Sequence, residues 1–431
     1  MSSKVKAILI IVPLVLVAGA AYWYLTGSDD SGPATSASLA ASASASPLSS
    51  LSPSGSPSTS PTPSAATTPM IAVASGPKSD TLALVSTDGD KTVLVKGDGH
   101  IITNVAISPS GAYIAYDKLA GKDRWTPWPS TLMVYDIAAD AEIALSGPGS
   151  SSVFPAFAAK AVGGHAWASD SVLIAVGYAA TPKNNWTNGQ FWRCDLAAKT
   201  VTPLEDGSGV ALEGTEPSIS ADGTRLAFVA YSNYKKEVLN AKGWVIKPAR
   251  VTETLDLFDG GSDTLSSVAT HKRTLDYDSG GFGTPRISPD GTEIFAQQTG
   301  SDVGFGITIW GDDGAKVFTS GTLVFPGGAD WDTSGSGMLA FAGSKNTTAS
   351  RSGIMLYDST AKSLKGILVS KKLFPADVAW SPDGEWLAYT VPSPRYNYRT
   401  VDLYLTNAGG TSNTLLLSDA GEPSFGEVAV P

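Results

Sequence analysis

Short apolar runs alternate with tight polar turns along most of this chain, and one arrangement of the two recurs. In the clearest copy, Trp380 is followed by the turn Ser381-Pro382-Asp383-Gly384 and by a second apolar run that ends at Tyr389. Proline presets the backbone of such a turn, aspartate bonds its own backbone, and glycine adopts the positive φ. Equivalent turns begin at Ser108, Ser220 and Ser288, and degraded copies occupy residues 167–175 and 331–341. A unit that returns about every 45 to 70 residues indicates a repeat architecture.

Each copy of the repeat predicts four strands. The two strands around the turn are followed by a third apolar strand that usually ends in aspartate, at Asp136, Asp195, Asp259 and Asp358. A turn rich in Gly, Ala and Lys comes next, and then a fourth short strand. Four antiparallel strands per repeat are typical of one blade of a β-propeller. The predicted fold class of residues 70–431 is therefore all-β, a β-propeller.

The two ends of the repeat region predict how the ring closes. Residues 70–95 supply three strands without a first strand, whereas the tail Glu422-Pro423-Ser424-Phe425 matches the inner first strand at Glu216-Pro217-Ser218-Ile219. The simplest assembly places the C-terminal strand innermost in the blade that begins at Met70, which removes the exposed sheet edges. The count is then seven four-stranded blades. Six blades remain as the alternative if the N-terminal strands only cap the last blade.

The N-terminal residues follow a different pattern. Residues 7–25 form an uncharged apolar run that is just long enough to span a bilayer as a helix. Lys4 and Lys6 precede this run and two aspartates follow it, which predicts a single-pass anchor in the cytoplasmic membrane with the C-terminal domain outside. The alternative is a signal peptide cleaved near Ala18-Gly19-Ala20, which would make the protein secreted.

A linker separates this segment from the repeats. Residues 27–69 are mostly Ser, Ala, Pro and Thr and cannot bury enough apolar surface to offset their chain entropy. We expect a disordered stalk, extended by its prolines. The predicted domains are residues 1–26 as a transmembrane anchor, 27–69 as the linker and 70–431 as the propeller.

The composition limits which partners and which kinds of site this chain can have. The net charge of −10 argues against a nucleic-acid partner, which would require a basic face. Cys194 is the single cysteine and lies inside an apolar strand, which predicts a buried side chain and excludes an intrachain disulfide. His165 starts an inner strand and is expected to be a structural histidine. Because the common nucleophile, zinc, P-loop and dinucleotide motifs are absent, we assign no catalytic residue, metal or cofactor.

The repeats allow a resemblance to be stated. The Ser-Pro-Asp-Gly turns, the Ile/Leu-Ala-Tyr/Phe runs after them and the Asp-terminated third strands resemble the WD-like repeats of TolB-family β-propellers over residues 70–431. The resemblance implies the propeller fold and leaves the function open. TolB itself, by this resemblance, is a soluble periplasmic protein with an N-terminal α/β domain. Here an apolar segment and a Ser/Pro-rich stalk stand in that domain's place.

Insertions predict which face of the propeller binds. They occur between predicted second and third strands, at residues 117–130, 179–189, 230–251 and 392–400, and so at one face, which usually marks a binding face. Exposed aromatic rings with polar neighbours suit recognition of a glycan or a peptide. The candidate ligand-binding residues of these insertions are Trp125, Trp128, Trp186, Trp244, Arg395, Tyr396 and Tyr398. The competing interpretation is that the rings pack the long loops onto the rim.

Two carboxylates complete the candidate set. Asp276 and Asp278 lie between a fourth and a first strand, near the expected channel mouth, where they could hold a cation or an amine; a plain turn also explains them. We expect a binding module of the bacterial envelope whose partner is an envelope protein, a peptide or a glycan, held at the membrane by its N-terminal helix. The alternatives are a propeller-type lyase or hydrolase acting on a polysaccharide or peptide, and a scaffold within an envelope complex.

Overall fold

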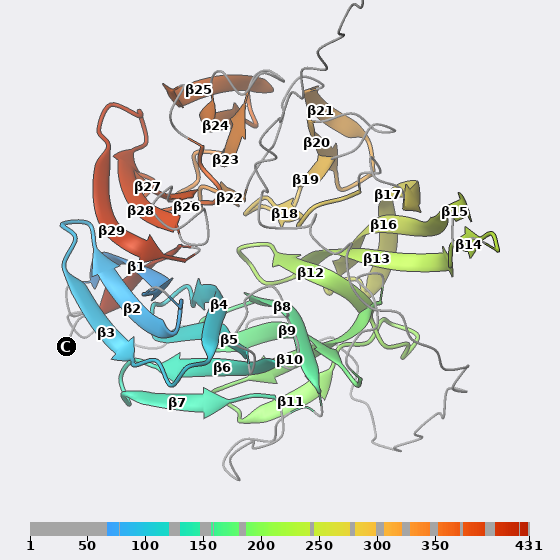
Figure 1. The fold of residues 1–431 in the computed structure, drawn as a ribbon, viewed down its shortest axis with the longest axis horizontal. Coiled ribbons are helices and arrows are strands. Elements are labelled where there is room, and N and C mark those ends of the chain that lie inside the picture. Colours follow the sequence, from blue (N-terminus) through green and yellow to red (C-terminus); the bar gives the residue numbers. More distant parts are fainter. Residues whose placement is uncertain are drawn as a thin grey trace, which may run out of the picture. The chain divides into compact units, whose positions relative to one another are not determined.

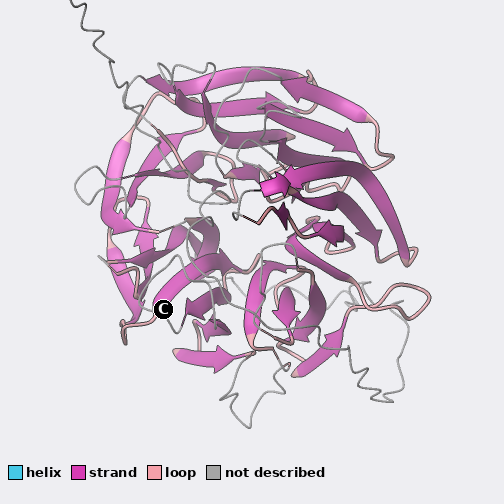
Figure 2. Ribbon diagram, turned by 45° about the vertical axis from the view of Figure 1, so that its right-hand side comes forward, coloured by secondary structure: helices cyan, strands magenta, loops and turns pink. Residues whose placement is uncertain are grey.

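The computed structural model consists of strands, turns and loops wherever it describes the chain, as Figure 2 shows. The described residues are 67–76, 78–119, 130–146, 157, 159–180, 187–241, 245–275, 281–298, 306–320, 328–344, 352–370, 374–392, 401–421 and 423–429. Within those ranges no helix is long and apolar enough to cross a membrane. The span predicted over residues 7–25 and most of the predicted stalk lie outside them.

The strands pair antiparallel in groups of four, which belong to one compact unit, Ser44–Pro431. Together with the apolar cores between the groups, this arrangement is a β-propeller, so the predicted fold class is confirmed. The first strand of each group lies towards the middle in Figure 1. In chain order the groups are β4 (Ile101–Ile107), β5 (Tyr113–Leu119), β6 (Ser130–Asp136) and β7 (Ala141–Ala144); β8 (Ala161–Trp167), β9 (Val172–Tyr178), β10 (Gly189–Asp195) and β11 (Thr200–Pro203); β12 (Glu213–Ile219), β13 (Arg225–Lys235), β16 (Ala249–Asp259) and β17 (Thr264–Leu275); β18 (Arg286–Ile287), β19 (Glu293–Gln298), β20 (Gly306–Gly311) and β21 (Lys316–Ser320); β22 (Ala329–Trp331), β23 (Met338–Ser344), β24 (Ser352–Asp358) and β25 (Ser363–Ser370); and β26 (Val378–Trp380), β27 (Trp386–Pro392), β28 (Val401–Asn407) and β29 (Thr414–Ala420).

The recurring turn holds the first and second strands of a blade together. Ser381 Oγ accepts a hydrogen bond from Trp386 N at 2.9 Å, and Asp383 Oδ1 accepts one from Glu385 N at 3.0 Å. Gly384 has a φ of 70°, a conformation that glycine adopts without strain. The turns at Ser220 and Ser288 repeat this geometry. The aspartates of these turns are therefore structural, as the sequence predicted.

Apolar side chains from neighbouring blades share one core. Trp380 and Leu387 of the last group pack with Ala340 and Leu356 of the group before it, and all four are buried. Trp331 is buried between the blades in the same way, and Trp167 is half-buried with its ring stacked on Tyr113. The predicted role of these tryptophans in packing between blades is confirmed.

Hydrogen bonds between inner strands link one blade to the next. Ser218 Oγ accepts from Ile287 N at 3.0 Å, and Asp330 Oδ2 accepts from Trp380 N at 2.8 Å. Trp167 Nε1 donates across the same kind of boundary to Ala106 O at 3.0 Å. Because each bond uses a backbone group that the short inner strands leave free, the inner ends of the blades cannot slide apart without losing it.

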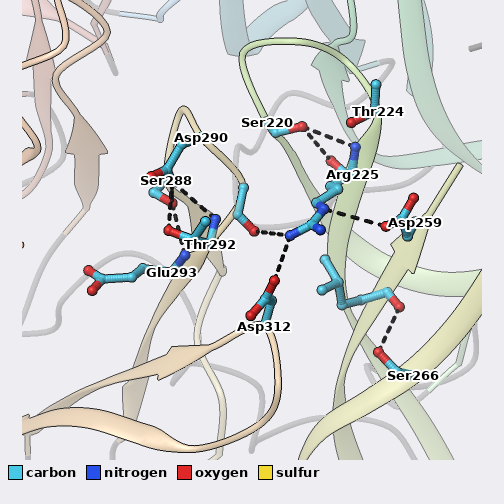
Figure 3. A network of polar contacts seen from close by, with 12 residues as sticks. Ser220, Thr224, Arg225, Asp259, Ser266, Ser288, Asp290, Thr292, Glu293 and Asp312 are labelled. Atoms are coloured by element: carbon cyan, nitrogen blue, oxygen red, sulfur yellow. Dashed lines mark hydrogen bonds and ion pairs between the residues drawn. The ribbon is translucent and has the colours of Figure 1, made fainter. Parts of the chain in front are cut away.

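Arg225 makes a second inter-blade link at the face of the short turns (Figure 3). Its Nη1 donates to Gly291 O at 2.9 Å and to Asp312 Oδ2 at 2.8 Å, and its Nε lies 3.5 Å from Asp259 Oδ2. This arginine of β13 therefore spans to turns of the β18–β21 blade. The contact gives Asp312, in the turn after β20, a structural partner.

The C-terminal strand closes the fold as predicted. β30 (Ser424–Ala429) pairs antiparallel with β1 (Thr67–Ser75), with Met70 opposite Gly426, and β1 continues into β2 (Thr81–Ser86) and β3 (Lys91–Val95). A Cβ on Gly426 would lie 2.4 Å from Ile107 Cγ2, so the strand packs directly on β4. Ser424 Oγ also accepts a hydrogen bond from Ile107 N at 3.1 Å. The two ends of the repeat region are thus joined in one blade.

One insertion is more ordered than expected. Residues 230–251 were predicted as loop, but β13 and β16 continue through Lys235 and from Ala249, and a short pair, β14 (Val238–Leu239) and β15 (Val245–Lys247), forms beyond them. Ala249 and Val251 of β16 are buried, whereas the end of β13 and the whole β14–β15 pair are exposed. The exposed strands therefore depend on pairing with a partner strand rather than on a buried face.

Deleting residues 423–431 should open the ring. The deletion removes β30 and with it Val428, which is buried in the core shared with Ile107 and Tyr116. We expect a loss of several kcal/mol, because a single large-to-small core change already costs about 2–5 kcal/mol. Deleting only residues 430–431 is the control and should leave the thermal melt unchanged. Equal melting of the long deletion and the parent would contradict closure by β30.

Candidate binding face

The predicted insertions share one end of their blades. Residues 120–129 connect β5 to β6, 181–186 connect β9 to β10, and 393–400 connect β27 to β28. The flanking residues are paired across the strands, Leu119 with Ser130 and Pro392 with Val401. In an antiparallel blade, connections from second to third and from fourth to first strand lie at the same end. We call this end the long-loop face; the strand phase predicted from the sequence is confirmed.

The nine candidate residues themselves lie outside the described residues, so their role in binding stays a prediction. They are Trp125, Trp128, Trp186, Trp244, Asp276, Asp278, Arg395, Tyr396 and Tyr398. The strand ends that flank these connections are described, and they form the base of the long-loop face.

A buried ion pair lies at this base between two blades. Glu253 of β16 is fully buried; its Oε1 accepts from Arg273 Nη1 at 2.8 Å and its Oε2 accepts from Phe282 N at 3.1 Å. His271 Nδ1 lies 3.8 Å from the same Oε2. One carboxylate therefore ties β16 and β17 to the start of the next blade. Sequence reasoning missed Glu253, although a glutamate at an inward position of an alternating strand was a signal for it.

This ion pair lies beside the first described residues after the connection that contains Asp276 and Asp278. Residues 276–280 themselves are outside the described part of the chain, and Phe282, just beyond them, donates its backbone N–H to Glu253. A Cβ on Gly281 would lie 2.4 Å from Glu253 Oε2 and 2.5 Å from Arg273 Nη1. Only glycine leaves room for the ion pair at this position.

Asn188, just before β10, and Tyr231 of β13 link the β8–β11 blade to the blade that contains β13 and β16, at the same face. Asn188 Nδ2 donates to Tyr231 O at 3.0 Å, and Tyr231 N donates to Asn188 Oδ1 at 2.8 Å. The side-chain amide of Asn188 thus forms hydrogen bonds with both the N–H and the C=O of Tyr231. Burial, with the nearby charges of Glu253 and Glu216, raises the pKa of the Tyr231 phenol, so this ring stays neutral and acts as a hydrogen-bonding group.

Three inner strands carry a residue in the left-handed region at equivalent places. Asn104 of β4, Gly164 of β8 and Glu216 of β12 have φ values of 52°, 116° and 56°, and the strand register shifts beside each of them. Such bulges re-aim side chains near functional sites. Glu216 Oε2 accepts from Thr284 Oγ1 of the neighbouring blade at 2.7 Å. Glycine and asparagine tolerate this backbone, but nothing in the sequence marks glutamate for it.

A second polar group lies beside the first of these bulges. Asn104 Nδ2 donates to Asp117 Oδ2 at 2.6 Å, and Asp117 Oδ1 is 3.5 Å from His165 Nδ1. Both Asp117 and His165 have almost completely buried side chains, and within the described residues neither ring nitrogen of His165 has a hydrogen-bond partner. A structural histidine was expected to have satisfied hydrogen bonds, and within the described residues those of the buried His165 ring are not satisfied.

These groups suit recognition through hydrogen bonds and charge. Cys194, the one thiol, is buried, and burial raises its pKa to about 12, so it is not a nucleophile at neutral pH. In the parts of the chain that the structure describes, no three His, Cys, Asp or Glu side chains lie close enough to hold a metal ion. The described base of the face thus offers fixed carboxylates, amides and a phenol around backbone bulges.

Solved structures with a similar fold include TolB and oligogalacturonate lyases. No protein-family model and no curated protein match the sequence. TolB from Acinetobacter baumannii is similar at 14% identity and a TM-score of 0.44, covering 83% of this chain and 66% of that protein. An oligogalacturonate lyase from Vibrio parahaemolyticus is similar at 12% identity and a TM-score of 0.49, over 81% and 85% of the two chains. An oligogalacturonate lyase in complex with manganese is similar at 14% identity and the same score, over 82% and 86%. Similarity at this level says nothing about a ligand or a reaction of this chain.

Glu253→Gln should destabilise the long-loop face. The change leaves Arg273 as a largely buried charge without its ion partner, and we expect the free energy of unfolding to fall by about 3 kcal/mol. Asp312→Asn is the matched control, because its pair with Arg225 is more exposed and should contribute only about 0.2–1 kcal/mol. Denaturant unfolding of both variants measures the difference. Equal small losses for the two would show that the buried pair does not hold this face together.

Proposed function

We propose that this protein is an extracytoplasmic, membrane-tethered β-propeller that binds an envelope protein, a peptide or a glycan through its long-loop face. The observation that carries the proposal is the asymmetry of the two faces. One face consists of short turns tied by their own Ser and Asp side chains, whereas the other receives the long connections. Long connections on a rigid scaffold are the usual carriers of binding residues.

The chemistry of the long-loop face supports a partner with both flat apolar and polar surfaces. The connections contain Trp125, Trp128, Tyr396 and Tyr398, and aromatic rings dominate the binding energy of many interfaces. Fixed polar groups such as Glu216 and Tyr231 lie at the base of the same face. Sugars and extended peptides offer this combination. The overall charge of −10 works against nucleic acid.

We further propose that the ring has seven blades. The pairing of β30 with β1 supports this count, because it makes the N-terminal strands a complete four-stranded blade rather than a cap. Six groups follow in chain order between β4 and β29. Val428 packs with Ile107 of the β4–β7 blade, and Phe425 packs with residues of the β26–β29 blade, so the closing blade has apolar contacts on both sides.

The tether is proposed from the sequence alone. The uncharged run over residues 7–25, with lysines before it and aspartates after it, supports a single-pass anchor with the propeller outside the cytoplasmic membrane. The Ser/Pro-rich residues 27–66 then separate the bilayer from β1. Cleavage near Ala18-Gly19-Ala20, the alternative, would give a secreted propeller with the same binding face.

Variants of the long connections should lose ligand without unfolding. We expect Trp125→Ala with Trp128→Ala, and Tyr396→Ala with Tyr398→Ala, to melt near the parent, since exposed substitutions stay within about ±0.5 kcal/mol. Trp380→Ala is the contrasting control: it empties a buried inter-blade position and should cost about 3–5 kcal/mol. Thermal melting is measured beside ligand capture, by crosslinking pull-down from cells and by a glycan array.

Each outcome of this comparison has a distinct meaning. Capture of an envelope protein that the loop variants lose supports protein recognition, and a glycan signal that they lose supports sugar recognition. Unfolding of the loop variants to the extent of Trp380→Ala would mean that the rings pack the rim. Turnover of a bound polysaccharide or peptide by the parent would instead favour the lyase or hydrolase alternative.

Protease treatment of intact spheroplasts tests the tether. With the N-terminus inside and the propeller outside, added protease should release a fragment that begins within residues 27–69, because that segment is predicted to be unfolded and accessible. Mass spectrometry of the released fragment locates the cut. Complete protection of the propeller in intact spheroplasts, with cleavage only after lysis, would overturn the orientation.

A further inference from the structure

One hairpin extends beyond the repeat geometry. β13 and β16 are each eleven residues long, against at most nine for the second and third strands of the other blades, and they lead into the two-stranded pair β14–β15. Figure 1 shows this pair at the right-hand edge, beyond the ends of β13 and β16. Leu239 is paired directly with Val245 across the two strands. We call residues 234–241 and 245–250 the hairpin tip.

The hairpin tip exposes large apolar side chains. Five of them are between 43% and 58% exposed: four lie on the two strands of the pair and the fifth lies at the end of β13. The five residues are Tyr234, Val238, Leu239, Val245 and Ile246. Half of the exposed large apolar residues in the described part of the chain thus fall within this short stretch. Exposed apolar side chains gathered in one place mark a site of contact with a protein or a membrane.

The charges around these side chains are positive. Lys235, Lys236, Lys247 and Arg250 are exposed at the hairpin tip, and Glu237 is the one acidic residue among its described residues. The chain as a whole carries a net charge of −10, so this basic cluster is a local exception. Lysine and arginine can also lay their apolar stems along a hydrophobic surface while the charged ends stay in water.

We propose that the hairpin tip inserts into the surface of a bilayer that contains anionic lipid. An apolar wedge with a basic collar is the composition of segments that lie about 5–10 Å deep in the headgroup region. Each basic side chain near an anionic leaflet contributes about 1 kcal/mol. A peptide added to the strand edge is the less favoured partner, because β14 and β15 are two and three residues long and offer few backbone groups for pairing.

The base of the hairpin is firmly held, so the tip is presented in a fixed direction. Asn188 bonds both backbone groups of Tyr231, and Tyr231 is paired with Glu253 on the neighbouring strand. Glu253 is in turn held by Arg273. Contact between the tip and a bilayer would turn the long-loop face towards the membrane. The inference depends on the hairpin's own residues and not on the ligand of the proposed function.

A fluorescent probe at the tip tests the inference in the full chain. An environment-sensitive dye is attached to Leu239→Cys, while Cys194 stays unlabelled because it is buried. Leu265→Cys is the matched control, since Leu265 has a similar exposure and lies on β17 of the same blade beside the short turn after Asp259. The protein is mixed with vesicles of phosphatidylcholine alone or of phosphatidylcholine and phosphatidylglycerol in equal parts. Emission and quenching by spin-labelled lipid are then measured.

We expect a blue shift and quenching for the Leu239 probe with phosphatidylglycerol vesicles, and an unchanged spectrum for the Leu265 probe. Adding Lys235→Glu and Lys236→Glu should return the Leu239 emission to its value in water, and circular dichroism should show the parent's melt. An unchanged Leu239 spectrum, or a blue shift that grows with protein concentration without lipid, would overturn the inference. Flotation with phosphatidylcholine vesicles reports the N-terminal tether separately.

Discussion

The pairing of β30 with β1 is the constraint on which the rest of the fold depends. Each blade buries its apolar faces against two neighbours, so a blade at an open end would leave one core half covered. The C-terminal strand removes both open ends at once, because Val428 packs towards Ile107 while Phe425 packs towards the β26–β29 blade. Gly426 permits the close approach to β4 that this requires. Residues more than three hundred positions apart in the sequence thus complete one four-stranded sheet.

In the closed propeller, the connections at the two faces differ in how much they can lengthen. At the short-turn face, Ser and Asp side chains satisfy the turn backbone, and Arg225 links adjacent blades, so little can be inserted there without losing hydrogen bonds. At the opposite face the connections can lengthen because the strands beneath them are already paired, as Leu119 is with Ser130. The buried Glu253–Arg273 pair and the Asn188–Tyr231 contacts then stabilise the base from which the connections leave. A base held by these contacts, below long connections, supports the proposal that this face binds a partner.

The β13–β16 blade departs most from the repeat. Its central strands continue into a hairpin whose tip is both apolar and basic, although the chain is acidic overall. The same blade carries the buried carboxylate that anchors the following connection through Phe282. The longest hairpin and the buried Glu253–Arg273 pair therefore belong to the same blade.

The sequence by itself determined the repeat, the strand phase and the closing strand, because these depend on local signals: the Ser-Pro-Asp-Gly turns, the alternating apolar runs and the match between residues 216–219 and 422–425. Burial of Trp331, Trp380 and Cys194 followed from the same alternation. The tertiary structure alone decided which polar residues meet. Glu253 meets Arg273 and Phe282, and Asp117 meets Asn104 and His165, only because separate strands or blades bring them together. The β14–β15 hairpin could not be predicted from the sequence either, since its pairing depends on partner strands rather than on the local pattern of apolar residues.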